Sequence, residues 1–234
     1  MLELHRIDAF YGQAHILHDI PLKVAAGERI AVVGRNGAGK STLLKSIVNA
    51  GPIVRGAVSL DGRPLGNMSA SDRVRLGVSL VPEDRRIFTH ITVAENILLA
   101  QYGTERKHGL PTMEEVVERF PMLKDLLGRL GGQLSGGQQQ VLAIARSIAA
   151  GPRLMLLDEP TEGLAPVIVE DLAEKIIEAC DTYGIALVLA EQNLRFARRC
   201  TSRMLLLDSG TTVFSGDWTE FGKSTDLVDR YLAV

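Results

Sequence analysis

The chain has 234 residues, of which 46% are hydrophobic and 23% are charged, and its formal net charge is -2. These values are typical of an ordinary soluble globular protein, and a nucleic-acid binder would usually be more basic. Two cysteines are too few for a disulfide framework or a zinc site, and no apolar run is long enough to cross a bilayer. Residues 1–8 lack the pattern of a signal peptide, so we expect a cytosolic chain unless a partner holds it at a membrane.

Three strands are expected before the first glycine-rich loop. Loose alternation of apolar and polar residues from Leu2 predicts an edge strand, and residues 16–24 and 30–33 predict two more. The first two strands are separated by Phe10-Tyr11-Gly12. An exposed Tyr11 could stack on a purine base, although a loop tyrosine is more often a packing residue.

A phosphate-binding loop is predicted by the stretch Gly34-Arg35-Asn36-Gly37-Ala38-Gly39-Lys40-Ser41-Thr42, which lies between an apolar strand and a segment of helical spacing. Its glycines allow the backbone to aim successive N–H groups at phosphate oxygens, and the following helix presents its positive end to the same anion. Lys40 can reach the β- and γ-phosphates, and the Ser41 hydroxyl can help to hold Mg²⁺. This loop predicts that the protein binds a nucleoside triphosphate.

Strands and helices alternate along most of the chain, which indicates an α/β core with a largely parallel sheet. Further strands are expected at residues 56–62 and 77–82, a helix capped by Ser69 at 69–76, a hairpin at 205–214 and a short helix at 226–232. Residues 92–147 interrupt the alternation with helical patterns at 93–99, 113–120 and 138–150. We therefore expect one domain over 1–234, with a nucleotide-binding core at 1–91 and 148–234 and an inserted helical subdomain at 92–147.

Two further motifs point to a triphosphatase. In Leu134-Ser135-Gly136-Gly137-Gln138, a natural helix N-cap stands beside two glycines that let the backbone approach a second phosphate. In residues 154–161, four apolar residues are followed by Asp158 and Glu159, at the strand end where ligands of α/β sheets bind. Asp158 is placed to hold Mg²⁺ and Glu159 to polarise the attacking water, since a metal relieves the repulsion between adjacent acids.

In this order, the three motifs resemble the ATP-binding subunit of an ABC transporter over essentially the whole chain. The resemblance implies a P-loop NTPase (RecA-like) core with an N-terminal antiparallel β subdomain and an inserted all-α subdomain. It also implies that each ATP lies between the phosphate loop of one subunit and the LSGGQ stretch of another, so that ATP closes a head-to-tail dimer and hydrolysis reopens it.

The resemblance also assigns site residues. It implies ATP contacts from Tyr11, as the adenine-stacking aromatic, and from Asn36, Gly37, Ala38, Gly39, Lys40, Ser41 and Thr42. Contacts with the partner's ATP are implied for Ser135, Gly136, Gly137 and Gln138. Catalytic roles fall to Glu159, Gln192 and Lys40, and Mg²⁺ is held by Ser41, Glu83 and Asp158.

Three positions depart from the usual family pattern. Glu83 stands where a glutamine normally contacts Mg²⁺ and water, and a carboxylate can still ligate the ion as an oxygen donor. Gln192 stands in place of a switch histidine; it can donate a hydrogen bond but cannot be charged or shuttle a proton. Ala165 replaces an aspartate that makes a contact across the dimer. These departures are similar to the branch that takes up branched-chain amino acids, urea and short amides.

In that branch the partner is usually a paralogous ATPase subunit, although a homodimer is the alternative. Two transmembrane permease subunits and, indirectly, an extracytoplasmic substrate-binding protein complete the implied assembly, which places the chain peripherally at the cytoplasmic face of the inner membrane. The segment 87–93 falls where the family receives a helix of the membrane subunit, with local packing as the alternative.

Competing functions are the ATPase of a lipid or lipopolysaccharide exporter and a soluble ABC ATPase outside transport. A guanine-nucleotide switch is disfavoured because the sequence holds no Asn-Lys-x-Asp stretch.

Overall fold

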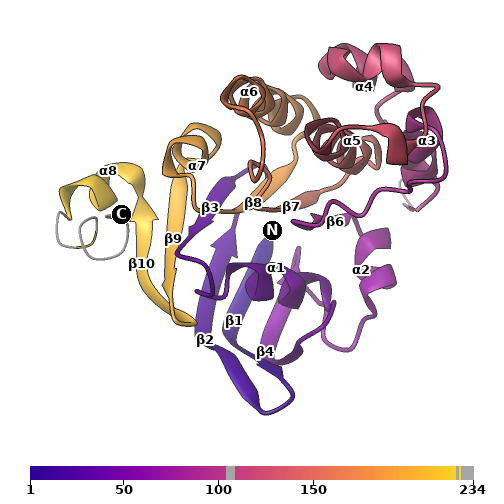
Figure 1. The fold of residues 1–234 in the computed structure, drawn as a ribbon. Coiled ribbons are helices and arrows are strands. Elements are labelled where there is room, and N and C mark those ends of the chain that lie inside the picture. Colours follow the sequence, from indigo (N-terminus) through magenta and orange to yellow (C-terminus); the bar gives the residue numbers. More distant parts are fainter. Residues whose placement is uncertain (104–108, 225–226, 228–234) are drawn as a thin grey trace.

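The computed structural model describes residues 1–103, 109–224 and 227, which form two β-sheets with helices between and above them (Figure 1). The antiparallel sheet has the order β2 (Ala14–Val24), β1 (Leu2–Tyr11), β4 (Ile53–Leu60) and β5 (Arg63–Pro64). The larger sheet has the order β10 (Thr211–Asp217), β9 (Arg203–Asp208), β3 (Arg29–Val33), β8 (Ala186–Glu191), β7 (Leu154–Asp158) and β6 (Val78–Val81). Its neighbouring strands are parallel except for the hairpin β9–β10, so the expected fold class is confirmed.

The position expected for the first strand was wrong. β1 lies inside the antiparallel sheet, with β2 on one side and β4 on the other, and Leu2 pairs with both Val24 and Leu60. The sequence shows the alternation of β1 but not which segments pair with it. β4 also begins earlier than expected, at Ile53.

Helices connect and cover the strands. They are α1 (Lys40–Val48), α2 (Ala70–Arg75), α3 (Val93–Tyr102), α4 (Met113–Arg119), α5 (Gly136–Ala149), α6 (Pro166–Tyr183), α7 (Leu194–Cys200) and α8 (Trp218–Lys223), with 3₁₀ turns η1 (Pro121–Leu126) and η2 (Gly131–Gln133). The sequence analysis did not anticipate α8, which starts with a capping box between Asp217 and Glu220. The helix expected at 226–232 lies almost entirely outside the described residues.

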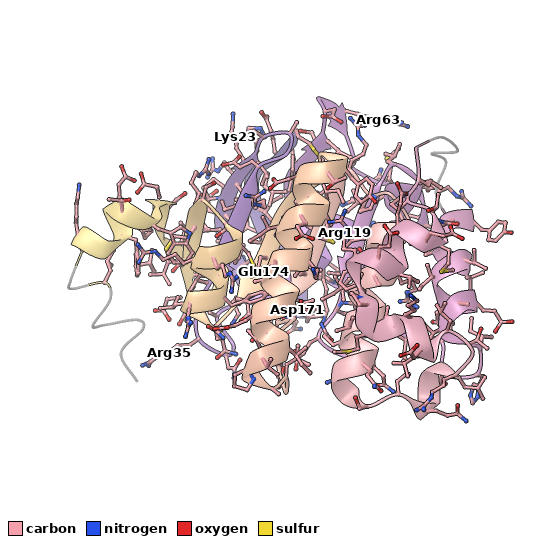
Figure 2. All side chains as sticks on the ribbon, turned by 90° about the horizontal axis from the view of Figure 1, so that it is seen from above. Lys23, Arg35, Arg63, Arg119, Asp171 and Glu174 are labelled. Atoms are coloured by element: carbon pink, nitrogen blue, oxygen red, sulfur yellow. The ribbon has the colours of Figure 1, made fainter. Side chains whose placement is uncertain are left out.

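The core consists of two apolar layers on opposite faces of the larger sheet. On one face, α1 is packed between the two sheets, and its Leu43, Leu44 and Ile47 are fully buried there. On the other face lie α5, α6 and α7 (Figure 1). Charged side chains project from α6 into solvent, among them Asp171 and Glu174 (Figure 2). No helix in the described part of the chain is long and apolar enough to span a membrane.

The segment 92–147 contains the starts of three α-helices, and each helix begins with a capping box. Thr92, Thr112 and Ser135 are N-caps whose side chains each close a capping box. This pairing satisfies two backbone donors at each helix start, which fixes where each helix begins. α5 continues to Ala149 and packs on β6 and α6 as well as on α3, so a helical subdomain at 92–147 remains a proposal whose end falls inside α5.

Candidate functional site

The phosphate loop connects β3 to α1, and its backbone requires glycine. Gly37 and Gly39 have φ angles of 80° and 105°, which side chains other than glycine rarely adopt. A Cβ on Gly39 would lie 2.6 Å from Cδ2 of Leu17, so β2 also leaves no room for a side chain. The loop therefore turns sharply into α1, with the first N–H groups of the helix free to bind an anion.

The same loop is held from the C-terminal part of the chain. The backbone N–H of Gly210, in the turn between β9 and β10, donates to the carbonyl of Ala38 at 3.0 Å. The carbonyl of Gly210 in turn accepts the N–H of His18 in β2 at 2.8 Å. Three segments that are far apart in the sequence thus meet at this loop.

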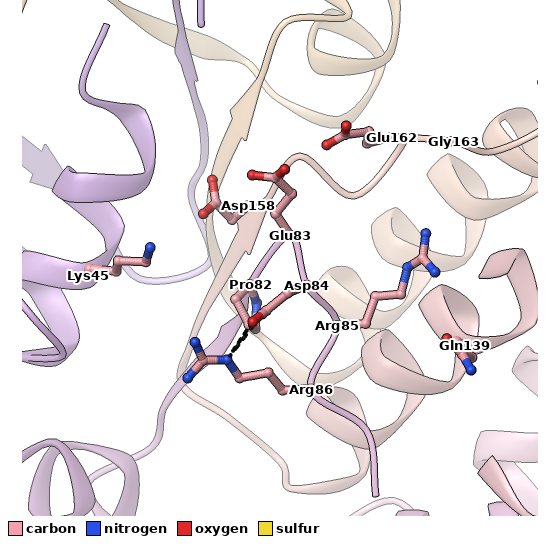
Figure 3. Close-up of a pocket in the computed structure, with 10 residues that line it drawn as sticks. All are labelled: Lys45, Pro82, Glu83, Asp84, Arg85, Arg86, Gln139, Asp158, Glu162 and Gly163. Carbon is pink, nitrogen blue, oxygen red and sulfur yellow. Dashed lines mark hydrogen bonds and ion pairs between the residues drawn. The ribbon is translucent and has the colours of Figure 1, made fainter. Parts of the chain in front are cut away.

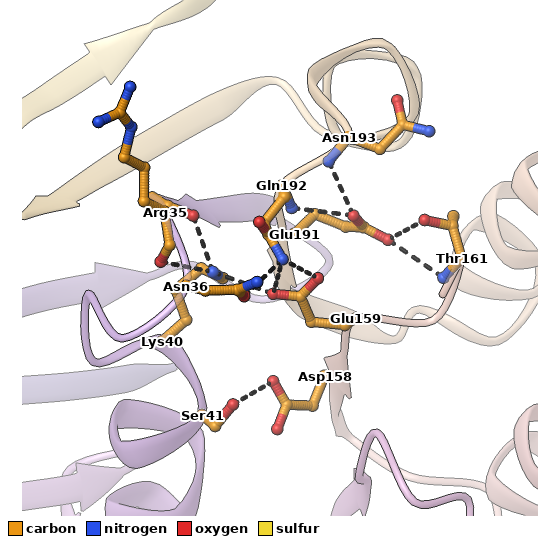
Figure 4. A network of polar contacts seen from close by, with 11 residues as sticks. Arg35, Asn36, Lys40, Ser41, Asp158, Glu159, Thr161, Glu191, Gln192 and Asn193 are labelled. Carbon is orange, nitrogen blue, oxygen red and sulfur yellow. Dashed lines mark hydrogen bonds and ion pairs between the residues drawn. The ribbon is translucent and has the colours of Figure 1, made fainter. Parts of the chain in front are cut away.

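Lys40 is buried at the start of α1, with 4% of its surface exposed. Its Nζ atom donates to the carbonyls of Gly34 and Arg35 at 2.7 and 3.1 Å, and it lies 2.9 Å from Oε1 of Glu159 (Figure 4). A buried ammonium requires such partners because its desolvation is costly. The lysine of the loop and the expected catalytic acid therefore lie in direct contact.

Ser41 and Asp158 also meet, as the sequence analysis expected. Ser41 Oγ donates to Oδ1 of Asp158 at 2.9 Å, and Asp158 is 2% exposed at the end of β7. Burial raises the pKa of Asp158, and the hydrogen bond from Ser41 and the charge of Lys45 oppose that rise. A hydroxyl and a carboxylate oxygen side by side are suitable ligands for Mg²⁺.

Glu83 lies on the loop after β6, beside a pocket of about 560 Å³. Figure 3 shows its carboxylate between Asp158 and Glu162. Burial, followed by the charge of Glu162 and a hydrogen bond to it, raises the pKa of Glu83. No three acidic, histidine or cysteine side chains among the described residues are close enough to hold a metal alone. The oxygen donors of Glu83 and Asp158 are of the type that a divalent cation prefers, and they would need Ser41 and phosphate to complete its shell.

Gln192 stands at the start of the loop after β8 and contacts the expected base. Its Nε2 donates to both carboxylate oxygens of Glu159, at 3.0 and 2.9 Å, and to Oδ1 of Asn36 at 2.7 Å (Figure 4). Glu159 has a left-handed φ of 48°, a conformation that side chains adopt at some energetic cost and often at functional sites. These contacts join residues of three loops around one carboxylate.

Glu191 is a buried acid that the sequence analysis did not single out. It ends β8 with 1% of its surface exposed, and it accepts hydrogen bonds from Thr161 and from the backbone after it. Burial raises the pKa of Glu191, and its hydrogen bonds oppose that rise. One signal was present: like Asp158, Glu191 is an acid at the carboxyl end of an apolar strand.

Ser135 is the N-cap of α5, and Gly136, Gly137 and Gln138 begin its first turn. Ser135 Oγ accepts the N–H of Gln138, and Gln138 Oε1 accepts the N–H of Ser135. The contact of these residues with the ATP of another subunit stays a prediction.

Tyr11 ends β1 with 42% of its surface exposed. Its hydroxyl lies 3.5 Å from where a Cβ on Gly51 would stand, beyond the C-terminal end of α1. A partly exposed ring is available for stacking, so the role of Tyr11 as an adenine contact stays a prediction.

A sequence model of the family described as "ABC transporter" matches residues 17–162, which is more than half of the chain. The chain belongs to this family. ABC transporter subunits of this kind bind and hydrolyse ATP, so the protein is an ATPase.

Relatives match the ABC chain over nearly its whole length. It is 35% identical over 232 residues to "High-affinity branched-chain amino acid transport ATP-binding protein BraG" of Pseudomonas aeruginosa, covering 99% of both chains. It is 33% identical over 220 residues to "Probable branched-chain amino acid transport ATP-binding protein LivF" of Archaeoglobus fulgidus, covering 94% of this chain and 93% of the relative. A solved structure, "Structure of ATP binding subunit of ABC transporter", has a TM-score of 0.81 at 27% identity and covers 99% of this chain and 96% of its own.

Proposed function

We propose that the chain is the energy-coupling ATPase subunit of an importer for branched-chain amino acids. The observation that carries this proposal is the match of 99% of the chain to a relative named for that transport, together with the convergence of Lys40, Ser41, Asp158 and Glu159 in one site. The relatives favour amino acids over urea or short amides as the transported class.

Nucleotide binding falls to the phosphate loop and Lys40. The triphosphate takes the place of Glu159 as the anionic partner of Lys40, since a phosphate oxygen can bind Nζ where this carboxylate lies at 2.9 Å. Asn36 to Thr42 supply backbone donors and Tyr11 stacks on the adenine ring. Ser41, Asp158 and Glu83 would hold Mg²⁺, which would neutralise charge on the phosphates when bound.

Hydrolysis falls to Glu159, freed from Lys40 when the triphosphate binds. Glu159 accepts the proton of the attacking water. Gln192 donates a hydrogen bond that orients either Glu159 or the γ-phosphate. Gln192 bears no proton that it can exchange at neutral pH, so proton transfer rests on Glu159 alone.

The second phosphate contact comes from another subunit. Ser135 and Gly136 are exposed at the N-terminus of α5, where backbone N–H groups and the helix dipole favour an anion. We infer that Ser135, Gly136, Gly137 and Gln138 close on the ATP of a paralogous partner, with a homodimer as the alternative. ATP then acts as part of the interface.

Coupling to permease subunits uses the surface beside α3. Phe88 and Leu99 are 51% and 45% exposed and border a groove of about 260 Å³ together with Val74. Buried Asn96 holds the backbone of Phe88 by bonds of 2.9 Å to both its N–H and its carbonyl. A permease helix that presses on Phe88 would thereby act on α3 and on the loop that carries Glu83. In this proposal the chain lies peripherally at the cytoplasmic face of the membrane.

A lipid exporter ATPase and a soluble ABC ATPase are less well supported, because the relatives of similar length are named for amino-acid transport. The test is reconstitution of the chain with its permease subunits, its substrate-binding protein and its suspected paralogue in vesicles. ATP hydrolysis is measured for the chain alone and for the mixture, and uptake is measured for leucine, glutamate and urea. Lys40→Ala serves as the inactive control.

We expect ATP-dependent leucine uptake with the wild-type chain and none with Lys40→Ala. Turnover by the lone chain would show that a homodimer is competent, whereas turnover only in the mixture would show an obligate heterodimer. ATP hydrolysis without uptake of any amino acid would refute the proposed function.

A further inference from the structure

Glu191 uses one carboxylate oxygen for each of two catalytic loops. Its Oε1 accepts the backbone N–H and the hydroxyl of Thr161, at 3.2 and 2.7 Å. Its Oε2 accepts the backbone N–H groups of Gln192 and Asn193, both at 3.0 Å (Figure 4). Thr161 lies two residues after Glu159, so this carboxylate ties the loop of Glu159 to the loop of Gln192.

This set of bonds suits an ionised carboxylate. All four partners are donors, and a carboxylate accepts on both oxygens without a proton of its own. Glutamine at this position would keep one accepting oxygen and turn an NH₂ group toward the donors of the other loop. A shorter aspartate would keep both oxygens but would draw them back from the loops.

The strand below fixes where the two loops begin. β8 lies between β3 and β7, and the carbonyl of Ala190 accepts the N–H of Glu159 at 2.9 Å. Glu191 therefore adds a second link directly above this one. Both links fix the backbone from which Glu159 and Gln192 extend. The amide of Gln192 then reaches the carboxylate of Glu159 at 3.0 and 2.9 Å.

We propose that Glu191 is a positioning residue for ATP hydrolysis, holding Glu159 and Gln192 in register through Thr161 and the backbone of residues 192 and 193. In this proposal it acts through these groups and not by direct contact with the reactants. The inference rests on the roles proposed for Glu159 and Gln192, and it predicts that Glu191 affects the chemical step far more than it affects ATP binding.

The test compares Glu191→Gln and Glu191→Asp with the wild type in steady-state ATP hydrolysis, using the active assembly. The affinity for a fluorescent ATP analogue and the melting temperature are measured on the same samples. Since a displacement of about 1 Å in a catalytic group can cost roughly 100-fold in rate, we expect kcat to fall about 10- to 100-fold in Glu191→Gln. KM and the affinity for the analogue should stay within about threefold of the wild-type values. The kcat of Glu191→Asp should lie between those of the wild type and Glu191→Gln.

Thr161→Val provides a second route that removes only one donor to the same carboxylate. Its matched control is Thr201→Val, which removes a buried hydroxyl that bonds to the carbonyl of Ala197 at 2.7 Å, away from the site. We expect kcat to fall in Thr161→Val but not in Thr201→Val. Combining Thr161→Val with Glu191→Gln should cost little more than Glu191→Gln alone, because both act on one link.

The inference is overturned if Glu191→Gln keeps kcat within about twofold of the wild type, or if ATP affinity falls in parallel with kcat. If Glu191→Gln does not fold, the threonine pair decides: equal turnover in Thr161→Val and Thr201→Val overturns the proposal. A wild-type chain that hydrolyses ATP but supports no amino-acid uptake refutes the proposed transport function and leaves the Glu191 comparison valid.

Discussion

The Nζ atom of Lys40 lies 2.9 Å from Oε1 of Glu159, so the lysine of the phosphate loop is paired with the acid expected to act as base. Only 4% and 10% of the two side chains are exposed, which shields the pair from solvent. An ATP phosphate that binds Lys40 would compete with this carboxylate for Nζ. The pair thus offers a link between phosphate binding and release of the expected base.

Glu159→Gln is expected to abolish turnover while ATP still binds. The amide cannot accept a proton from water, yet it has nearly the shape of the carboxylate and leaves Lys40 free for phosphate. Steady-state hydrolysis and size-exclusion chromatography with ATP should show an inactive protein trapped as a dimer. Turnover within about tenfold of the wild type, or roughly 1.4 kcal/mol of barrier, would exclude Glu159 as the base.

Gln192→Glu should be more damaging than Gln192→Ala. The alanine variant loses the bonds to Glu159 and Asn36, whereas the glutamate variant places a second carboxylate about 3 Å from the first, where both cannot easily ionise. We expect kcat to fall roughly 10-fold in Gln192→Ala and roughly 100-fold or more in Gln192→Glu. The opposite order in a kcat measurement at pH 7.5 would contradict the expected repulsion between residue 192 and Glu159.

Asp158→Asn should stabilise the nucleotide-free protein. Burial raises the folded-state pKa of Asp158 above its ordinary value of 3.8, so ionisation costs the folded state more than the unfolded state. The free energy of unfolding attributable to this group falls as pH rises from 3.8 through the raised pKa, and asparagine avoids that loss. Melting curves at pH 7 should show a higher melting temperature than wild type, with the difference shrinking toward pH 4.

The same variant should lose Mg²⁺-dependent hydrolysis, because a neutral amide is a weaker ligand than a carboxylate. Ser41→Ala is a useful comparison, since it removes the hydrogen bond to Asp158 but keeps the charge. A lower melting temperature for Asp158→Asn at pH 7 would contradict the expected cost of burying this carboxylate.

Ala165→Asp should stabilise the fold through α6. Ala165 occupies the N-cap of α6 and makes no side-chain capping bond, while Pro166 follows at the first helical position. An aspartate there can accept a free backbone N–H, which contributes about 1 kcal/mol and raises the melting temperature by roughly 2–4 °C in a chain of this size. Ala165→Ser caps without added charge and should give a similar shift; no shift in either variant would contradict the prediction.

The motifs predicted the parts of the site that lie at strand ends. The contact between Ser41 and Asp158, which are 117 residues apart, follows from a phosphate loop and an acid-ended strand in one parallel sheet. The contact of Gln192 with Asn36 could not be predicted, because no pattern tells which of two loops a side chain will reach. Glu191 was missed for a related reason: its partners are mostly backbone groups, which carry no sequence signature.

The order of strands in the antiparallel sheet could not be predicted from the sequence either. The alternation in β1 is the same for an edge strand and for an interior strand, and only the register of β4 against it decides between them. In contrast, the parallel sheet was predictable because its strands are apolar throughout and alternate with helices.

The turn at Gly210 makes the nucleotide site dependent on both ends of the chain. Residues 17–162, which carry the family match and all three sequence motifs, contain neither this turn nor β8 with Glu191 and Gln192. A fragment cut to those residues would have the phosphate loop but would lose the N–H that braces Ala38 and the strand that lies beside β3. The shortest unit that can bind ATP in this geometry therefore extends from β1, which carries Tyr11, at least through the β9–β10 hairpin.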